Sequence, residues 1–441
     1  MHNGFIVEVK ELRPHTNADK LQLATFFGET VVVGLDTKVG DIGIYFPCDL
    51  QLSLEYCDNN KLCRKNADGS DGEGYLERDK RNIKAISLRG EKSYGLYAPL
   101  ASLTFTGIDL TSLKVGDTIT TVNGKEICCK YIPRKSGRAA AGGANRTRKK
   151  KVPTAPLFAE HADTEQLAYN LSAFRPGDEI EITLKMHGTS QRTGYLPVLQ
   201  GYRRTIWDRI FRRQGEPVYD YGYVSGTRRT VLEDFDGGYY GSNEFRETHS
   251  KQFEGKLWKG ETVYYEVVSF TNDGTPIMGK GKVPKEAQNL YGKETIFHYG
   301  LSQGSDMYVY RMTMTNPDGE VVEYTPDFMR YRCEQMGIKT VPVFWKGYLG
   351  GKNCPYADNC TKEDCNIGEC VKRIAEEFYD GPDPIGKTHV REGVVIRIIN
   401  RPKFLAFKHK NFLFKQIAGI ITEQAADTND ITISDDILAE M

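Results

Sequence analysis

The sequence EIEITLKMHGTS, residues 179–190, decides how the second half of the chain is interpreted. Its first part alternates apolar and polar residues with a period of two, which predicts a β-strand with the two isoleucines and Leu184 on one face. Lys185 then leaves the strand end on the opposite face, and Gly188 follows it, a small residue that lets backbone or ligand approach closely. A lysine in this position can be the nucleophile of a covalent enzyme if burial or a neighbouring cation lowers the pKa of its amine, although most lysines at strand ends are solvated.

The composition is that of an ordinary soluble globular protein. The chain has 441 residues, enough for two or three domains, and is 39% hydrophobic and 27% charged. Basic and acidic residues number 59 each, so any affinity for nucleic acid has to come from local clusters. The N-terminus lacks the pattern of a secretory signal, and no apolar run approaches the roughly 18 residues of a membrane span. We therefore expect a cytoplasmic monomer without membrane association, whose ten cysteines are reduced thiols or, where clustered, metal ligands.

The chain divides into two predicted domains. Residues 1–132 hold short strand patterns broken by glycine, which favour a small β-barrel or sandwich. Residues 133–156 are small and basic without apolar periodicity, which predicts a flexible linker that is either a solvated spacer or a contact for phosphates. Residues 157–418 alternate longer strand and helix patterns, with a short helix expected at 164–171. The acidic residues 419–441 are predicted to form a tail or a terminal helix. The clearest strand patterns of the first domain are 5–9, 30–34, 43–46, 84–88 and 117–120.

One short stretch of the first domain points to RNA. The sequence HTNADKL at 15–21, followed by VVVG at 31–34, resembles the opening of the tRNA-binding OB modules attached to some aminoacyl-tRNA synthetases. A polar turn before a strand explains the same residues equally well. Both interpretations are compatible with a five-stranded OB-like barrel that could contact RNA.

Three further strand patterns, at 262–270, 391–398 and 404–410, carry charged residues. Glu266 lies in the middle of the first, and Glu392 lies at the start of the second. In the third, the period of two places Lys408 and Lys410 on one face. Taken singly, each of these residues is ordinary, because edge carboxylates and solvated strand faces are common.

Taken in order, the motifs are specific. They are KMHG at 185–188, SGTRR at 225–229, YEV at 265–267, MYVY at 307–310, EGVVI at 392–396 and K-x-K at 408–410. This series resembles the motifs of the covalent nucleotidyltransferases, which include polynucleotide ligases and mRNA-capping enzymes, and within them the RNA ligases. KMHGTS is most similar to the RNA ligase 2 branch. An OB-like domain ahead of the catalytic domain is similar to the nick-sealing RNA ligases of the Deinococcus type.

The resemblance implies an α+β fold, in which a nucleotidyltransferase (ATP-grasp-like ligase) domain of antiparallel sheets flanked by helices follows a small OB-like β-barrel. It also implies an ATP-dependent RNA ligase that acts in three steps. The lysine takes AMP from ATP, AMP passes to an RNA 5′-phosphate, and an RNA 3′-hydroxyl displaces AMP and seals the strand. The implied partner is RNA with such ends, in a nicked duplex, and the implied use is RNA repair.

The resemblance gives each charged motif residue a role. Lys185 would carry AMP, while Lys408 and Lys410 would lower the pKa of its amine by repulsion and neutralise phosphate charge. Glu392 would hold Mg²⁺ or Mn²⁺. Glu266 would accept hydrogen bonds from the ribose hydroxyls.

Two assignments in the nucleotide site stay open at this point. Arg228 or Arg229 would contact the ribose or the RNA 5′-phosphate, because a guanidinium fork suits phosphate. Tyr310 would stack on the purine. Because Tyr310-Arg311 replaces the common Phe-Asp pair, Tyr308 is the alternative platform.

Two segments look like insertions relative to a minimal ligase, near 201–220 and 346–385. The first mixes arginines with aromatic residues, which suits either a partly buried surface helix or a surface that stacks on bases and contacts phosphates. The second contains four cysteines within seventeen residues, a number that suits a tetrahedral zinc, although the first C-x5-C spacing is unusual and free thiols are the alternative. They are Cys354, Cys360, Cys365 and Cys370.

Three other functions compete with an RNA ligase. DNA ligases and GTP-using capping guanylyltransferases belong to the same superfamily, but they normally carry an OB domain after the catalytic domain, and about thirty residues follow Lys410 here. The third is a catalytically inactive RNA-binding protein. All six motifs retain the residues that the reaction requires, which argues against this alternative.

Overall fold

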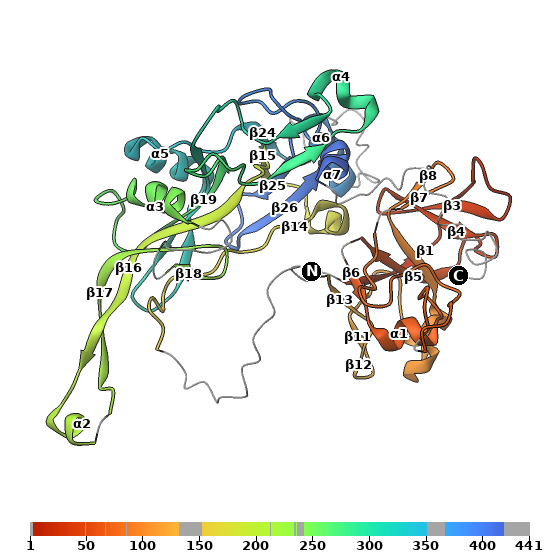
Figure 1. Ribbon diagram of the computed structural model, residues 1–441, viewed down its shortest axis with the longest axis horizontal. Coiled ribbons are helices and arrows are strands. Elements are labelled where there is room, and N and C mark those ends of the chain that lie inside the picture. The colour runs from red at the N-terminus through yellow and green to blue at the C-terminus, as the bar shows by residue number, and fades with distance from the viewer. Residues whose placement is uncertain are drawn as a thin grey trace. The chain divides into compact units, whose positions relative to one another are not determined.

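The computed structural model describes two stretches of the chain, 3–131 without 49, 67 and 85, and 152–418 without 212, 233, 234, 236–241 and 351–366. The described residues up to 131 fall in one compact unit, and those from 152 to 417 fall in a second (Figure 1). Both contain antiparallel sheets with helices, so the predicted α+β class is confirmed. The acidic segment 419–441 and most of the basic segment 133–156 lie outside the described residues. No helix in the described part of the chain is long and apolar enough to span a membrane.

The N-terminal unit is built from short strands. They are β1 (Gly4–Glu8), β2 (Leu12–Pro14), β3 (Leu21–Phe26), β4 (Glu29–Gly34), β5 (Ile42–Pro47), β6 (Leu50–Leu52), β7 (Ile86–Leu88), β8 (Glu91–Ser93), β9 (Gly95–Pro99), β10 (Thr118–Ile119), β11 (Thr121–Val122), β12 (Lys125–Glu126) and β13 (Cys128–Lys130). The helical elements are α1 (Leu54–Asn59), η1 (Leu100–Thr106) and η2 (Leu110–Ser112). The largest sheets are β10-β1-β5-β9 and β2-β3-β4. Among the described residues these ladders stay open rather than closing into a barrel, so the OB-like assignment stays a prediction.

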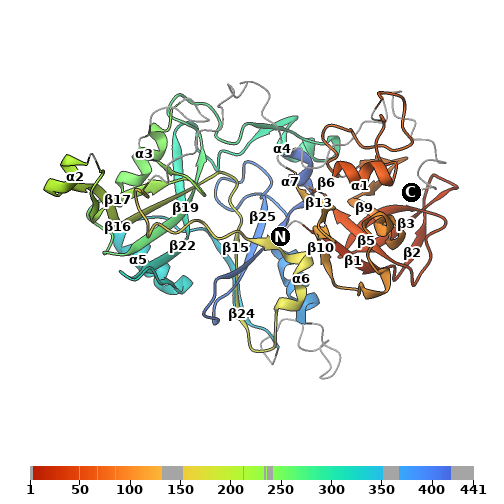
Figure 2. The ribbon, with the colours of Figure 1, turned by 90° about the horizontal axis from the view of Figure 1, so that it is seen from below.

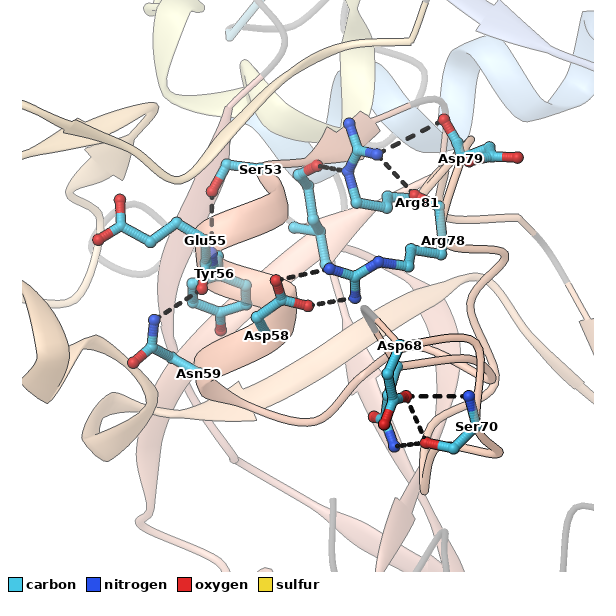
Figure 3. A network of polar contacts seen from close by, with 12 residues as sticks. Ser53, Glu55, Tyr56, Asp58, Asn59, Asp68, Ser70, Arg78, Asp79 and Arg81 are labelled. Atoms are coloured by element: carbon cyan, nitrogen blue, oxygen red, sulfur yellow. Dashed lines mark hydrogen bonds and ion pairs between the residues drawn. The ribbon is translucent and has the colours of Figure 1, made fainter.

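Polar contacts tie α1 to the loop that follows it (Figure 3). The Ser53 hydroxyl accepts from the Tyr56 N–H at 3.0 Å and caps the helix. Arg78 binds both carboxylate oxygens of Asp58, and the Arg81 Nε donates to the Leu52 carbonyl at 3.1 Å. Exposed ion pairs of this kind contribute at most about 1 kcal/mol each, so their main effect is to fix the path of the loop.

The second unit contains two larger sheets, which hold the strands that carry the motifs. The five-stranded sheet has the order β14 (Glu165–Gln166), β26 (Leu405–Lys410), β25 (Gly393–Ile398), β15 (Glu179–Leu184), β24 (Val343–Tyr348). The six-stranded sheet has the order β18 (Val231–Leu232), β17 (Glu216–Gly226), β16 (Thr189–Arg203), β19 (Glu261–Ser269), β22 (Ser305–Thr315), β23 (Val321–Glu323). The remaining elements are η3 (Leu167–Tyr169), η4 (Leu171–Ala173), α2 (Ile206–Ile210), α3 (Glu244–Lys251), β20 (Lys280–Lys282), η5 (Lys285–Ala287), α4 (Gln288–Tyr291), β21 (Glu294–Ile296), α5 (Pro326–Met336), α6 (Ile367–Phe378) and α7 (Phe412–Ile417).

The lysine strand forms as predicted, with one difference. The isoleucines of β15 are fully buried in a core shared with α6 and β25. Glu181, expected on the polar face, is also buried, at 2% exposure. Arg330 on α5 binds both of its carboxylate oxygens, at 3.0 and 2.7 Å, and supplies the counter-charge that a buried carboxylate requires.

The helix predicted at 164–171 is wrong. Glu165 and Gln166 form β14, which pairs in parallel with Phe407 and Lys408 of β26, and two short 3₁₀ turns follow. Eight residues are too few for a stable isolated helix. Pairing with an edge of the sheet and burial of Leu167 in the core therefore decide the local structure.

The segment at 201–220 forms the far end of a long hairpin. β16 and β17 pair from Arg192 and Gly226 outward to Arg203 and Glu216, and the ladder is interrupted by one bulge, between Leu199 and Gly201. The five-residue helix α2 lies at the tip (Figures 1 and 2). A partly buried surface helix is therefore the wrong interpretation, because only the five residues of α2 are helical in the described part of the segment, none of them is buried, and strands lead into and out of the tip. We call residues 198–220 the arm.

Candidate active site

A cavity of about 500 Å³ lies between the two large sheets of the second unit. The five-stranded sheet and the residues at its strand ends contribute Lys185, Glu392 and Lys410 to its lining. The six-stranded sheet contributes Glu266 and Tyr310, and Arg228 follows β17. Six of the seven residues predicted to bind nucleotide therefore line one cavity, although they are far apart in the sequence, spread over residues 185–410.

Strand register brings the charged residues together. Lys185 follows β15 directly, and its N–H donates to the Gly393 carbonyl at 3.0 Å on the neighbouring β25. Gly393 is paired in turn with Lys410 on β26. Since Glu392 directly precedes Gly393, the three side chains meet where the strands β15, β25 and β26 lie next to one another.

The Glu392 carboxylate is the centre of this charge cluster. Its Oε1 lies 2.8 Å from the Lys185 Nζ and 3.1 Å from the Lys410 Nζ, and its Oε2 lies 3.4 Å from His187 Nδ1. Only 3% of the side chain is exposed. Burial would raise the pKa of this carboxyl, but Lys185, Lys410 and His187 together hold its pKa well below the usual range. Glu392 is therefore an ionised, buried carboxylate.

Lys408 lies beside the cluster without lining the cavity. Its side chain is half-buried, and burial together with repulsion from Lys410 and Lys185 lowers its pKa to about 8. Repulsion between neighbouring lysines therefore acts on Lys408, whereas the predicted effect of Lys408 and Lys410 on the amine of the first motif stays a prediction. The Lys408 amine is consequently part uncharged just above neutral pH.

Glu266 stands on the six-stranded sheet, opposite Ser190 of β16 and Tyr308 of β22. Burial raises its pKa to about 7, and the Glu392 charge adds to the effect, while Lys185 opposes it. The two carboxylates of the cavity therefore differ, since Glu392 is ionised at neutral pH and Glu266 changes its charge near neutrality.

This difference predicts a pH dependence for nucleotide binding. An ionised Glu266 accepts hydrogen bonds from hydroxyl groups, so we expect affinity for ATP to rise about tenfold as the pH increases through about 7. Ionising a carboxyl whose folded-state pKa lies above its unfolded value costs stability, which should fall between pH of about 4.5 and 7 and stay constant above. Glu266→Gln should flatten both profiles in equilibrium binding and urea titrations. If the variant still shows the pH dependence of ATP affinity or of stability, that dependence arises from another titrating group.

The two candidate platforms for a purine are separated by a register shift. Tyr265 pairs with Val309 and Tyr264 pairs with Arg311, so Tyr310 has no partner residue on β19. Tyr310 lines the cavity, where its Oη lies 2.9 Å from the Ser190 hydroxyl. The Tyr308 hydroxyl instead donates to Asp306 at 3.1 Å, away from the lining. The geometry favours Tyr310.

The two adjacent arginines also differ. Arg228 lines the cavity and forms an ion pair with Asp163 at 2.5 Å. Arg229 does not line it, lies 3.5 Å from the same carboxylate, and is 68% exposed in its side chain. Arg228 is therefore the better placed of the two for contact with a nucleotide.

Three further polar residues in the cavity lining or next to it were not among the predicted site residues. His187 contacts Glu392, and its N–H donates to the Tyr299 hydroxyl at 2.7 Å. His161 packs its edge against Tyr310, with ring centroids 5.5 Å apart. Arg246 on α3 reaches the Thr189 hydroxyl and the Ser190 carbonyl, behind the lysine motif. His187 stood in the motif itself, whereas no pattern in the sequence marks His161 or Arg246.

Gly188 allows the lysine loop to lie against β19. A Cβ at this position would lie 2.3 Å from the Val267 carbonyl oxygen and 3.0 Å from the Glu266 Cγ. We expect Gly188→Ala to lower the free energy of unfolding by about 1–3 kcal/mol and to weaken nucleotide binding, because β19 has to move. Gly222→Ala on β17 is the control, since its Cβ would meet no atom closer than 3.6 Å. Chemical denaturation measures the free energy of unfolding of both variants. If both lose the same amount, the clash of the Cβ with β19 is not the cause.

The cavity suits a divalent cation that arrives with a triphosphate. Within the described residues, no cluster of three or more histidine, cysteine or acidic side chains can hold a metal alone. Mg²⁺ in enzymes is commonly held by one or two carboxylates together with substrate phosphates, and Glu392 and Glu266 supply two carboxylates. The predicted zinc site has no comparable support. Cys354, Cys360 and Cys365 lie outside the described residues, and Cys370 is buried on α6.

Solved structures of one enzyme share this fold. The chain superimposes on an RNA ligase of Naegleria gruberi with PPi, with a TM-score of 0.54, 18% identity, and coverage of 94% of this chain and 98% of that one. A mutant of that ligase with ATP and Mn gives 0.53, 18%, 93% and 97%, and a mutant with AMP and Mn gives 0.53, 17%, 94% and 98%. Neither a protein-family model nor a curated protein matches the sequence. The chain therefore has the predicted RNA-ligase fold over nearly its whole length.

Proposed function

We propose that this protein is an ATP-dependent RNA ligase that joins 5′-phosphate and 3′-hydroxyl RNA ends through lysyl-AMP and RNA-adenylate intermediates. The observation that carries the proposal is the meeting of Lys185, Glu392 and Lys410 at one cavity, in the fold of an RNA ligase. A cavity of about 500 Å³ also lies within the usual size range for small-molecule sites.

The side chains suit the first step in the following way. The Lys185 amine attacks the α-phosphorus of ATP, a P–N bond forms, and the bond to the departing pyrophosphate breaks. Before it attacks, the amine has to leave its 2.8 Å contact with Glu392 and release its extra proton to solvent, so that its lone pair is free. Lys410 and Lys408, beside the same carboxylate, neutralise the charge on the phosphates as it develops.

The remaining residues hold the nucleoside. Tyr310 offers its ring to the purine, Glu266 accepts from the ribose hydroxyls, and Arg228 contacts the ribose or the RNA 5′-phosphate. Glu392, with Glu266 nearby, would hold Mg²⁺ or Mn²⁺, which when bound neutralises triphosphate charge and orients the pyrophosphate.

The proposal extends to the parts of the chain. Residues 1–132 would be an OB-like domain that contacts RNA, 133–156 a basic linker, 157–418 the catalytic domain, and 419–441 an acidic tail. The protein would act as a cytoplasmic monomer on nicks in RNA duplexes.

Nucleotide transfer to the chain tests this function. The protein is incubated with Mg²⁺ or Mn²⁺ and with ATP or GTP labelled at the α-phosphate, and the denatured chain is analysed for covalent label. We expect label from ATP alone. Label from GTP would indicate a capping guanylyltransferase, and no label from either would indicate an inactive RNA-binding protein. Sealing of nicked RNA, nicked DNA and open single strands at one salt concentration then distinguishes an RNA ligase from a DNA ligase.

A further inference from the structure

The tip of the arm exposes apolar side chains to an extent that folding does not explain. On and beside α2, Ile206, Trp207, Ile210 and Phe211 are 75, 67, 61 and 60% exposed. The Trp207 and Phe211 rings are nearly parallel, 15° apart, with centroids 6.1 Å apart. Grouped, exposed apolar residues of this kind mark an interaction surface rather than a core.

The same tip is strongly basic. Arg203, Arg204, Arg209 and Arg213 are all exposed, and within the described part of the chain none of them forms an ion pair. The sequence from 200 to 216 contains five arginines and two acidic residues, and the acidic Asp208 is engaged in capping α2 through Thr205.

We infer that the arm tip binds RNA, at a distance from the ends that are joined. Flat aromatic rings among arginines offer bases a stacking surface and offer phosphates a charged fork, a combination typical of surfaces that bind nucleic acid strands. A second copy of this chain is a poor occupant, because two tips with the same positive charge repel each other. The inference rests on the proposed function in one respect, that the polyanion is the RNA substrate.

The length of the arm determines where this contact falls. β16 runs for 15 residues from Thr189, in the cavity lining, to Arg203 at the tip. At about 3.3 Å per residue this strand spans roughly 45 Å. The B-form rise of about 3.4 Å per base pair converts this length to on the order of a dozen base pairs, and the A-form duplex of RNA, which rises less per base pair, to somewhat more. The tip therefore reaches RNA at least about a dozen base pairs from the sealed ends. The arm should matter for long duplexes and not for short ones.

Binding and sealing by arm variants test the inference. R203Q/R209Q/R213Q removes three exposed charges and keeps Arg204, whose Nε donates to the Gln214 carbonyl at 3.3 Å and ties the two sides of the tip together. For a nicked RNA duplex of about 30 base pairs, we expect the triple variant to raise Kd at least about tenfold and to reduce the salt slope by about 2–3. W207A should weaken binding about fivefold or more by removing a stacking ring.

The controls separate local contact from general loss of charge. K285Q/K293Q/R373Q removes three exposed charges elsewhere in the unit and should leave Kd within about twofold of the wild type. With a duplex of about 10 base pairs, the arm variants should bind and seal as the wild type does. Thermal melting shows that each variant is folded, and the arm variants should raise KM for long RNA while kcat and lysyl-AMP yield stay unchanged.

Each contrary result overturns the inference. Unchanged affinity of the triple variant for the long duplex excludes RNA contact, as does an equal loss in the control variant. If the arm variants keep their affinity for RNA but lose binding to an acidic protein, the tip binds a protein partner instead. Lysyl-AMP formation is measured separately. If the chain never takes up AMP but binds long RNA through the arm, the proposed ligase activity is wrong and the arm contact stands.

Discussion

Lys185→Ala is expected to abolish transfer of AMP to the chain and to reduce sealing of RNA with a 5′-phosphate end by at least about 10³-fold, because the variant has no nucleophile for the α-phosphorus. Lys185 follows β15 and lies 2.8 Å from Glu392 in the cavity, so its removal deletes the group that the geometry presents to a nucleotide. The measurement is covalent label from ATP, followed by gel analysis of sealed RNA.

Two comparisons make the Lys185 result specific. Lys185→Arg keeps the positive charge beside Glu392 but has no attacking amine, and it should be as inactive in label transfer as the alanine variant. RNA that already carries a 5′-adenylate bypasses the lysine, so both variants should still seal it at a measurable rate. Label that persists in Lys185→Ala would show that another residue carries AMP.

Glu392→Gln is expected to lower label transfer by about 10²–10³-fold and the free energy of unfolding by about 3–5 kcal/mol. The amide keeps the shape of the side chain, but it removes the negative charge shared by Lys185, Lys410 and His187. The two lysines then face each other in a partly buried site without a counter-charge. The carboxylate proposed to hold the divalent cation is lost with it, so added Mn²⁺ should restore little of the rate.

A second buried ion pair provides a control that distinguishes a loss of stability from a loss of catalysis. Glu261 is fully buried and pairs with Arg332 at 2.8 Å, but neither residue lines the cavity. Glu261→Gln should cost stability of the same order and leave label transfer, measured below the melting temperature, within about threefold of the wild type. If both glutamine variants lose label transfer equally, the role of Glu392 is structural and the assignment of a catalytic carboxylate is wrong.

Much of the site followed from the sequence because its residues lie on strands. The period of two in 179–184 and 404–410 fixed which side chains share a face, and the order of the motifs linked Lys185 to Glu392 and Lys410. The structure brings these three together through the pairing of β15, β25 and β26.

What the sequence did not predict depends on contacts between distant elements. The burial of Glu181 requires Arg330, a residue of α5 that lies 149 positions away in the chain. β14 replaced an expected helix because β26 offered it an edge. Long-range partners of this kind leave no local pattern, and the positions of His161 in the cavity lining and of Arg246 next to it were missed for the same reason.

The pairing of β15 with β25 also sets when the site can exist during synthesis of the protein. Thr183 of β15 and its neighbour Val395 of β25 are 212 residues apart in the chain. At about 5–20 residues per second, roughly 10–40 s separate the emergence of the lysine from that of its carboxylate and the two downstream lysines. A nascent or truncated chain that ends before Glu392 contains Lys185 without the carboxylate and the two downstream lysines of the cluster. Under the proposed function, only chains that extend through Lys410 would consume ATP, and an adenylated protein would be one whose catalytic unit has been completed.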